Sequence, residues 1–241
     1  MKQILIFLLA VFIPTSFVFA GDPLPDLKIK QLDDGVYLHT SFQVFSGVVM
    51  GSNGLVVLDH NDAYIVDTPW SAEDTEKLLS WIKANGFSVK GSISTHSHDD
   101  RTAGIALLNS KAIPTYASKM TNGFLEKAGK AQAKNSFDSK DFWWVKDQVE
   151  VFYPGAGHAP DNLVVWLPKQ KILFGGCLIR AKEAKNLGNV ADAVIGEWPR
   201  SAEKLQEKYG NAKVVVPGHG EVGDVSLLEH TKELAAASAR K

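Results

Sequence analysis

The 241-residue sequence has a single cysteine, Cys177, so no internal disulfide can form. In an exported protein, a thiol left over in an oxidising compartment requires an explanation. Two explanations remain open from the residue alone. Cys177 is either a buried side chain that packs as a small hydrophobe, or a metal ligand whose thiolate is held by the ion.

The sequence also lacks an excess of positive charge. It contains 26 Lys and Arg residues against 27 Asp and Glu, for a net charge of −1, and no basic block. Nucleic acid is therefore not an expected partner. No repeat, low-complexity tract or Pro/Gly/Ser-rich linker divides the chain. Residues 21–241 are long enough for one domain with a sizeable core, which we expect to be a monomer.

Long hydrophobic runs are missing except at the N-terminus. Residues 1–20 carry a positive charge at Lys2, continue with an apolar run that Pro14 interrupts, and end in small residues. The run is too short for a membrane-spanning helix and is typical of a signal peptide. We expect cleavage after Ala20, export to the periplasm, and no membrane anchor afterwards, because no cysteine stands beside the cleavage site.

The remaining sequence alternates between strand and helix patterns. Short alternating apolar runs over about 27–68 predict a meander of antiparallel strands. Residues 71–86 predict a helix, with a capping serine at its start and a glycine at its end. Further strands and helices follow, with helices over about 102–109 and 119–129, a second run of strands over about 136–180, and helices near 198–209 and from 224. This order favours two packed sheets with helices outside.

The stretch "STHSHDDRTAG" carries the first sign of chemistry. On an extended segment, side chains alternate, so His96, His98 and Asp100 point the same way. Imidazole and carboxylate groups at this spacing suit zinc. A solvated polar turn is the alternative, and the motif alone does not exclude it.

Three more potential ligands follow apolar strand patterns and lie next to glycines: His158, Cys177 and His219. Strand ends of this kind can converge on one rim of a sandwich. We expect one zinc on His96, His98 and His158, and another on Asp100, Cys177 and His219. Three protein ligands leave each ion an open position, as in catalytic sites. The other histidines lack this setting and are expected to be structural: His39 and His60 lie within strand patterns, and His230 lies on a late helix face.

Together these residues resemble the metallo-β-lactamase superfamily, whose motifs run in the order Asp, H-x-H-x-D-H, His, Asp or Cys, His. The corresponding residues here begin with Asp67 in "YIVDTPW" and span nearly the whole chain. Arg101 stands where the superfamily has a second-site histidine, and Cys177 where it has a bridging aspartate. Both departures resemble the cysteine-containing dizinc subclass of true β-lactamases. The resemblance implies an α/β fold, the αββα sandwich, with two mixed sheets and helices outside.

The resemblance also implies roles for individual residues. Asp67 would hold the metal loop by accepting backbone N–H bonds. Arg180, in "CLIR", would bind the substrate carboxylate, and Asn186, in "NLG", would lie near the developing oxyanion. Phe45, at the tip of the segment "TSFQVFSG", would lie in a flap over the metal rim and cover the apolar side of the substrate.

The activity implied is hydrolysis of the amide bond of β-lactam antibiotics, namely penicillins, cephalosporins and carbapenems. A zinc-bound hydroxide oriented by Asp100 would attack the lactam carbonyl, and the result would be antibiotic resistance. Two alternatives remain: a hydrolase of this fold acting on a lactone, ester or thioester, and an exported zinc-binding protein without catalysis. Two S-x-x-K matches suggest a serine mechanism, but the S-D-N and K-T-G motifs that should accompany them are missing.

Overall fold

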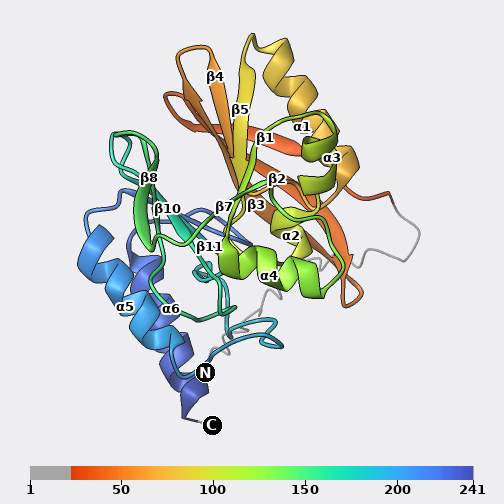
Figure 1. Ribbon diagram of the computed structural model, residues 1–241. Helices are drawn as coiled ribbons and strands as arrows, with labels where there is room; N and C mark the ends of the chain where they lie inside the picture. Colours follow the sequence, from red (N-terminus) through yellow and green to blue (C-terminus); the bar gives the residue numbers. More distant parts are fainter. Residues whose placement is uncertain (1–22, 241) are drawn as a thin grey trace, which may run out of the picture.

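Two β-sheets face one another in the computed structural model, which describes residues 23–240 (Figure 1). The expected signal peptide, residues 1–20, lies outside the described residues. The first sheet has seven strands in sequence order: β1 (Lys28–Asp33), β2 (Val36–Phe45), β3 (Val48–Asp59), β4 (Asp62–Val66), β5 (Ser88–Ile93), β6 (Thr115–Ser118) and β7 (Asn135–Phe137). Neighbours from β1 to β4 are antiparallel, and those from β4 to β7 are parallel.

The second sheet has five strands in the order β12-β11-β10-β9-β8. They are β8 (Asp141–Val145), β9 (Val149–Phe152), β10 (Val164–Leu167), β11 (Ile172–Gly176) and β12 (Val214–Pro217). All neighbours are antiparallel except β11 and β12, which are parallel because α5 (Trp198–Tyr209) connects them. Both sheets are therefore mixed, as the sequence predicts.

The alternation of side chains along the strands explains how the sheets and helices stack in layers. Along β10, Val165 and Leu167 face the other sheet, where they pack with Leu55 and Val57 of β3. The intervening Val164 and Trp166 face outward, onto helices. Because side chains on a strand alternate between faces, a strand that is apolar at every position needs cover on both sides. The αββα sandwich expected from the sequence is confirmed.

Helices cover both outer faces (Figure 1). The first sheet carries α1 (Ala72–Ala84), α2 (Asp99–Thr102), α3 (Ile105–Ser110) and α4 (Lys119–Lys127), and the second carries α5 (Trp198–Tyr209) and α6 (Ser226–Ala239). Leu78 and Ile82 of α1 pack on Ile65 of β4. Leu205 of α5 and Leu228 of α6 belong to the outer core of the second sheet. None of the helices within residues 23–240 has the length and apolarity needed to cross a membrane.

Two local features differ from the sequence expectations. The single helix expected near 102–109 is divided into α2 and α3 at Gly104, where an added Cβ would lie 2.5 Å from Thr75 Oγ1 and 2.8 Å from Thr68 Cβ. The chain passes too close to these residues for a side chain. His60 lies in the turn between β3 and β4, with φ of 54°, and not within a strand.

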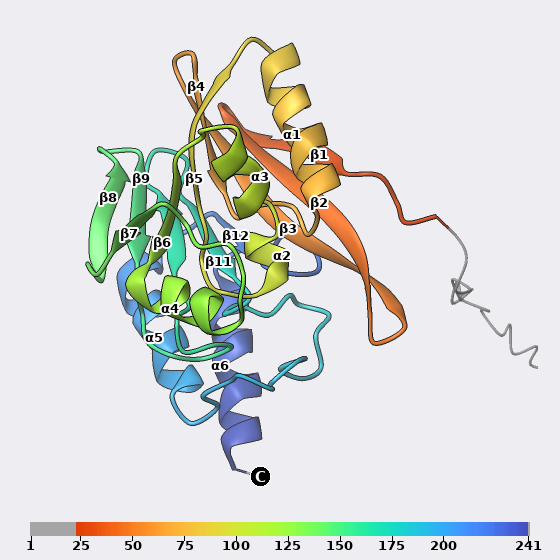
Figure 2. The same ribbon diagram turned by 45° about the vertical axis from the view of Figure 1, so that its right-hand side comes forward.

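The β2–β3 hairpin extends beyond the other strands (orange in Figure 2). Its turn consists of Ser46 and Gly47, whose φ values of 51° and 77° are both positive. This is the pattern of a two-residue hairpin turn that matches strand twist. The hairpin tip therefore presents Val44, Phe45 and Val48 to solvent, with exposed fractions of 60%, 39% and 62%.

Candidate metal centre

The ends of five elements deliver the candidate ligands to one rim of the sandwich. His96 and His98 follow β5, and Asp100 lies in the first turn of α2. The other three come from the second sheet: His158 from the β9–β10 loop, Cys177 immediately after β11, and His219 two residues after β12. The structure brings all six residues together, because the parallel strand pairs β4–β5 and β11–β12 end at the same rim.

The three histidines His96, His98 and His158 form the first group. Their candidate ligand atoms all lie within 4.8 Å of one another, and His98 Nδ1 is 3.1 Å from His158 Nε2. His96 Nε2 is buried without a hydrogen-bond partner in the described chain. An orphaned buried imidazole nitrogen that faces two others fits a metal ligand. Burial and the neighbouring imidazole of His98 lower the pKa of His158 to about 3, so the ring is neutral, as a ligand must be.

Asp192 orients one of these rings. Its Oδ2 lies 2.9 Å from His98 Nε2 and leaves Nδ1 facing His158. A carboxylate on the far nitrogen of a ligating histidine fixes the tautomer and ring orientation. Asp192 lies in the long loop before α5, where no sequence pattern singles it out.

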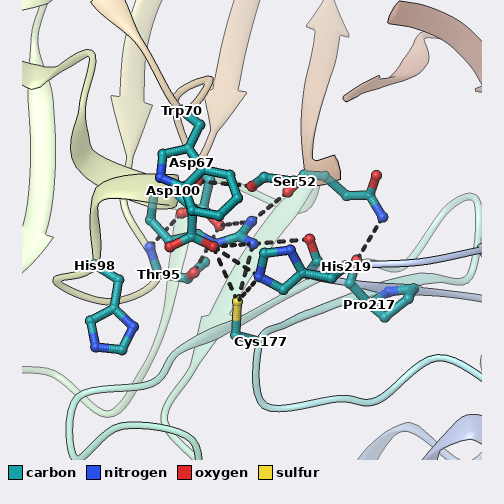
Figure 3. Close-up of polar contacts among 12 residues, drawn as sticks. Ser52, Asp67, Trp70, Thr95, His98, Asp100, Cys177, Pro217 and His219 are labelled. Atoms are coloured by element: carbon teal, nitrogen blue, oxygen red, sulfur yellow. Dashed lines mark hydrogen bonds and ion pairs between the residues drawn. The ribbon is translucent and has the colours of Figure 1, made fainter. Parts of the chain in front are cut away.

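The second group consists of Asp100, Cys177 and His219, which point toward one another in Figure 3. Cys177 Sγ lies 3.4 Å from Asp100 Oδ2 and 3.3 Å from His219 Nε2, and His219 Nε2 lies 3.2 Å from Asp100 Oδ2. His219 Nδ1 is 2.8 Å from the carbonyl oxygen of Gly51, so Nε2 is the nitrogen available as a ligand. One sulfur, one oxygen and one nitrogen form a donor set that zinc accepts.

Arg101 lies beneath this second group and is completely buried. Its Nη2 is 2.8 Å from Asp100 Oδ2, 3.1 Å from Cys177 Sγ and 3.0 Å from the carbonyl oxygen of Gly218. Its Nη1 is 3.3 Å from Asp67 Oδ2 and also donates to the carbonyl oxygen of Asn53. Arg101, which occupies the position of the superfamily's second-site histidine, is therefore a fixed cation that holds the candidate ligands Asp100 and Cys177 in place.

Gly218 allows this close packing. A Cβ there would lie 2.6 Å from Cys177 Sγ and 2.8 Å from Arg101 Nη2. The "GHG" stretch therefore serves to bring its histidine close to Cys177 and Arg101.

Asp67 connects the first sheet to the metal loop. It adopts a left-handed backbone conformation, with φ of 59°, and its carboxylate accepts hydrogen bonds from Thr95 N at 2.7 Å and Thr95 Oγ1 at 2.8 Å. His39 Nε2 lies 3.0 Å from the Asp67 carbonyl oxygen and supports this conformation from β2. These contacts fix Thr95, the residue before His96.

The charges of the rim shift several pKa values. Burial raises the pKa of Asp67 to about 7, although Arg101 and Thr95 oppose the shift. Burial also opposes ionisation of Asp100, but the charges of Arg101 and His219 hold its pKa well below the usual range. Burial lowers the pKa of His219, yet Cys177 and Asp100 raise it to about 10. The Asp100–Cys177 pair therefore attracts positive charge, which favours a cation at this point.

A cavity of about 520 Å³ opens over the rim. Its lining includes His98, Asp100, His158 and His219 from the two groups. The remaining walls come from the hairpin, the segment before α1, the loop after α4 and the long loop before α5, including Phe45, Met50, Trp70, Lys130, Arg180, Glu183, Asn189 and Asp192.

Arg180 and Asn189 form part of one wall, and Asn186 does not. Arg180 Nε donates to the Asn186 carbonyl oxygen at 3.2 Å, and its Nη nitrogens form no ion pair with a carboxylate of residues 23–240. The Asn186 side chain accepts from Gly188 N at 2.9 Å and so stabilises a local turn. Asn189, three residues later, makes the equivalent contact with Ala191 N at 3.2 Å, but unlike Asn186 it lines the cavity.

Phe45 and Trp70 form an apolar part of the cavity wall. Their ring centroids are 6.3 Å apart, and Trp70 lies 5.8 Å from the His219 ring. Trp70 N donates to Ser41 Oγ at 2.8 Å, which fixes the tryptophan beside the hairpin. Trp70 is not among the residues predicted from the sequence, although its position three residues after Asp67 is a signal for it.

Comparisons with known proteins agree with this geometry. The family profile described as "Metallo-beta-lactamase superfamily" matches residues 46–219. The chain is 53% identical to a "Metallo-beta-lactamase type 2" of Pseudomonas aeruginosa, over 95% of this chain and 93% of that protein. It is 36% identical to a protein of the same name from Elizabethkingia meningoseptica, over 92% of this chain and 90% of that protein.

Solved structures of metallo-beta-lactamases are also similar to this chain. The crystal structure of DIM-1 metallo-beta-lactamase exposed to ceftazidime superposes with a TM-score of 0.88 at 48% identity, over 90% of this chain and 100% of that one. The structure of TMB-1, described in terms of substrate and inhibitor binding, has the same TM-score and coverage at 51% identity.

Proposed function

The chain belongs to the metallo-beta-lactamase superfamily, and on that premise we propose that it is a zinc-dependent β-lactamase that confers antibiotic resistance. The observation that carries the proposal is one cavity lined by His98 and His158 of the first group, by Asp100 and His219 of the second, and by Arg180. Arg180 is a cation that has no ion-pair partner in residues 23–240. The names of the relatives support the same substrate class.

We propose two zinc ions per chain. His96, His98 and His158 would hold one, and Asp100, Cys177 and His219 the other. Bound zinc lowers the pKa of water toward neutrality and polarises a carbonyl group. Asp100 Oδ2 is engaged by Arg101, Cys177 and His219, so we assign Oδ1 to orienting the attacking water. No covalent acyl-enzyme is part of this proposal.

The test of the function is hydrolysis of a chromogenic cephalosporin by the purified protein, before and after treatment with a chelator and after zinc is added back. A β-lactamase shows turnover that the chelator abolishes and zinc restores. Turnover of a lactone, ester or thioester without turnover of the cephalosporin would favour another hydrolase. Bound zinc without turnover of any of these would indicate a non-catalytic protein.

Arg180 is assigned to the carboxylate that bicyclic β-lactams carry. We expect Arg180→Ala to raise KM for such substrates about tenfold, equivalent to about 1.4 kcal/mol, while kcat changes little, because the interaction is the same in the ground and transition states. Steady-state kinetics measure the effect. Lys185→Ala is the matched control, since Lys185 lies in the same loop but not on the cavity wall. An unchanged KM in Arg180→Ala would reassign the carboxylate to another cation, such as Lys182.

A second residue is assigned to the reaction: a side-chain amide that would stabilise the developing oxyanion. The sequence placed it at Asn186, but the cavity wall favours Asn189. We expect Asn189→Ala to lower kcat about tenfold, by removing a donor that acts mainly in the transition state. Asn186→Ala loses only a turn contact and should retain most of its kcat. The reverse order of effects in the two variants would restore the assignment to Asn186.

Phe45 is assigned to the apolar side of the substrate. Burying part of its ring would contribute roughly 1–2 kcal/mol. Phe45→Ala should therefore lower kcat/KM about tenfold for substrates with bulky apolar substituents and spare those with small ones. Its exposed fraction of 39% predicts little change in melting temperature. An equal loss for every substrate, or a marked fall in Tm, would make Phe45 a structural residue.

We also propose that the protein is exported to the periplasm and acts there as a monomer. The composition of residues 1–20 supports export.

A further inference from the structure

Glu183 occupies a fixed place on the cavity wall. It lies three residues after Arg180, and its Oε1 accepts a hydrogen bond from Glu221 N at 3.1 Å. The same oxygen lies against Gly220, where φ is 85° and an added Cβ would collide with it. Glu183 thus bridges the loop after Cys177 and the loop after His219, which holds its carboxylate beside the cavity.

The other acidic residues of the lining have cationic or imidazole partners. Asp99 pairs with Lys130 at 2.8 Å, Asp100 with Arg101 at 2.8 Å, and Asp192 with His98 at 2.9 Å. Within residues 23–240, Glu183 forms no ion pair and accepts from a backbone N–H. Its negative charge is therefore the least compensated on the wall.

The charge of Glu183 can affect which β-lactams bind, because of where their substituents lie. In cephalosporins and carbapenems, the carboxylate and a variable substituent are attached to adjacent carbons of the second ring. If the carboxylate binds Arg180, the adjacent substituent lies on the part of the wall that carries Glu183. We propose that Glu183 is a specificity-determining residue that favours β-lactams whose substituent next to the carboxylate is cationic. This inference rests on the proposed function.

The test compares two cephalosporins that share one acyl side chain and differ only at C3, where one has a pyridiniummethyl group and the other an acetoxymethyl group. The quantity measured is the ratio of their kcat/KM values, cationic over neutral. We expect Glu183→Gln to lower this ratio about two- to fivefold, the size of a solvent-exposed charge pair. Glu183→Lys should lower it further. Both effects should shrink in about 1 M NaCl, where the Debye length is about 3 Å.

Glu221→Gln is the matched control, because it removes the same charge from an exposed neighbour that does not line the cavity. Its ratio should equal that of the wild type. Glutamine at position 183 can still accept from Glu221 N, so Glu183→Gln should fold normally, and Tm checks this. An unchanged ratio in both Glu183 variants, or an equal fall in Glu221→Gln, overturns the inference. If the wild type hydrolyses neither compound, the proposed function fails instead.

Discussion

Cys177→Ala is expected to lower bound zinc from about two ions per chain to about one, and kcat/KM by more than about 100-fold. The thiol is one of three potential ligands in the second group, within 3.4 Å of both Asp100 Oδ2 and His219 Nε2. Without it, two protein donors remain, fewer than catalytic zinc sites provide. The loss should exceed the 10- to 100-fold typical of residues outside the coordination sphere. Metal analysis after dialysis and steady-state kinetics measure the two effects.

Cobalt substitution provides a readout that a purely structural role would not change. A thiolate bound to cobalt produces a charge-transfer absorption, which should be present in the wild type and absent in Cys177→Ala. Cys177→Ser serves as the near-isosteric control for packing around a side chain that is almost fully buried. If Cys177→Ala retains two metal ions and its full rate, Cys177 is a buried hydrophobic residue and the second site has been misassigned.

The sequence predicted the layers of the fold because its strands obey a simple periodicity. Segments such as Val164–Leu167 are apolar at every position, and the structure buries them on both faces. A helix as strongly capped as α1 is also predictable, since Ser71 Oγ accepts from Asp74 N at 3.0 Å. The division at Gly104 was not predictable, because it depends on contacts with Thr68 and Thr75 from distant parts of the chain.

The six candidate ligands were predictable because each follows a strand or precedes a helix with a clear pattern. The loop from Arg180 to Trp198 lacks such a pattern, so nothing local distinguishes Asn186 from Asn189. Arg101 presents a different problem. Its sequence position marked a departure from the family, but only the structure reveals that its guanidinium binds Asp100, Cys177 and Asp67 at once. A buried cation with partners far apart in the sequence leaves no local signal.

That burial makes Arg101 the residue whose loss should most affect stability. Arg101→Met keeps a long side chain but removes the charge, which leaves the carboxylates of Asp67 and Asp100 buried without their cation. Breaking a buried pair in this way costs about 3–5 kcal/mol of unfolding free energy. For a domain of this size, this corresponds to a fall in Tm of about 6–20 °C in chelator-treated protein. Arg180→Met removes a cation without a buried partner and should remain within about 0.5 kcal/mol of the wild type.

The Tm deficit of Arg101→Met should also depend on pH, because the protonation of Asp67 depends on it. Its pKa of about 7 lies above the value of about 3.9 expected in the unfolded chain, so the native state binds the proton more tightly. Stability from this group therefore increases as the pH falls from about 7 toward 4, and decreases as the pH rises. Because Arg101 opposes the upward shift, Arg101→Met should raise the pKa of Asp67 further and extend this dependence to higher pH. Thermal unfolding at pH 5.5 and pH 8 should show the larger Tm deficit at pH 8. An Arg101→Met protein as stable as the wild type at both pH values would mean that the guanidinium does not compensate these carboxylates.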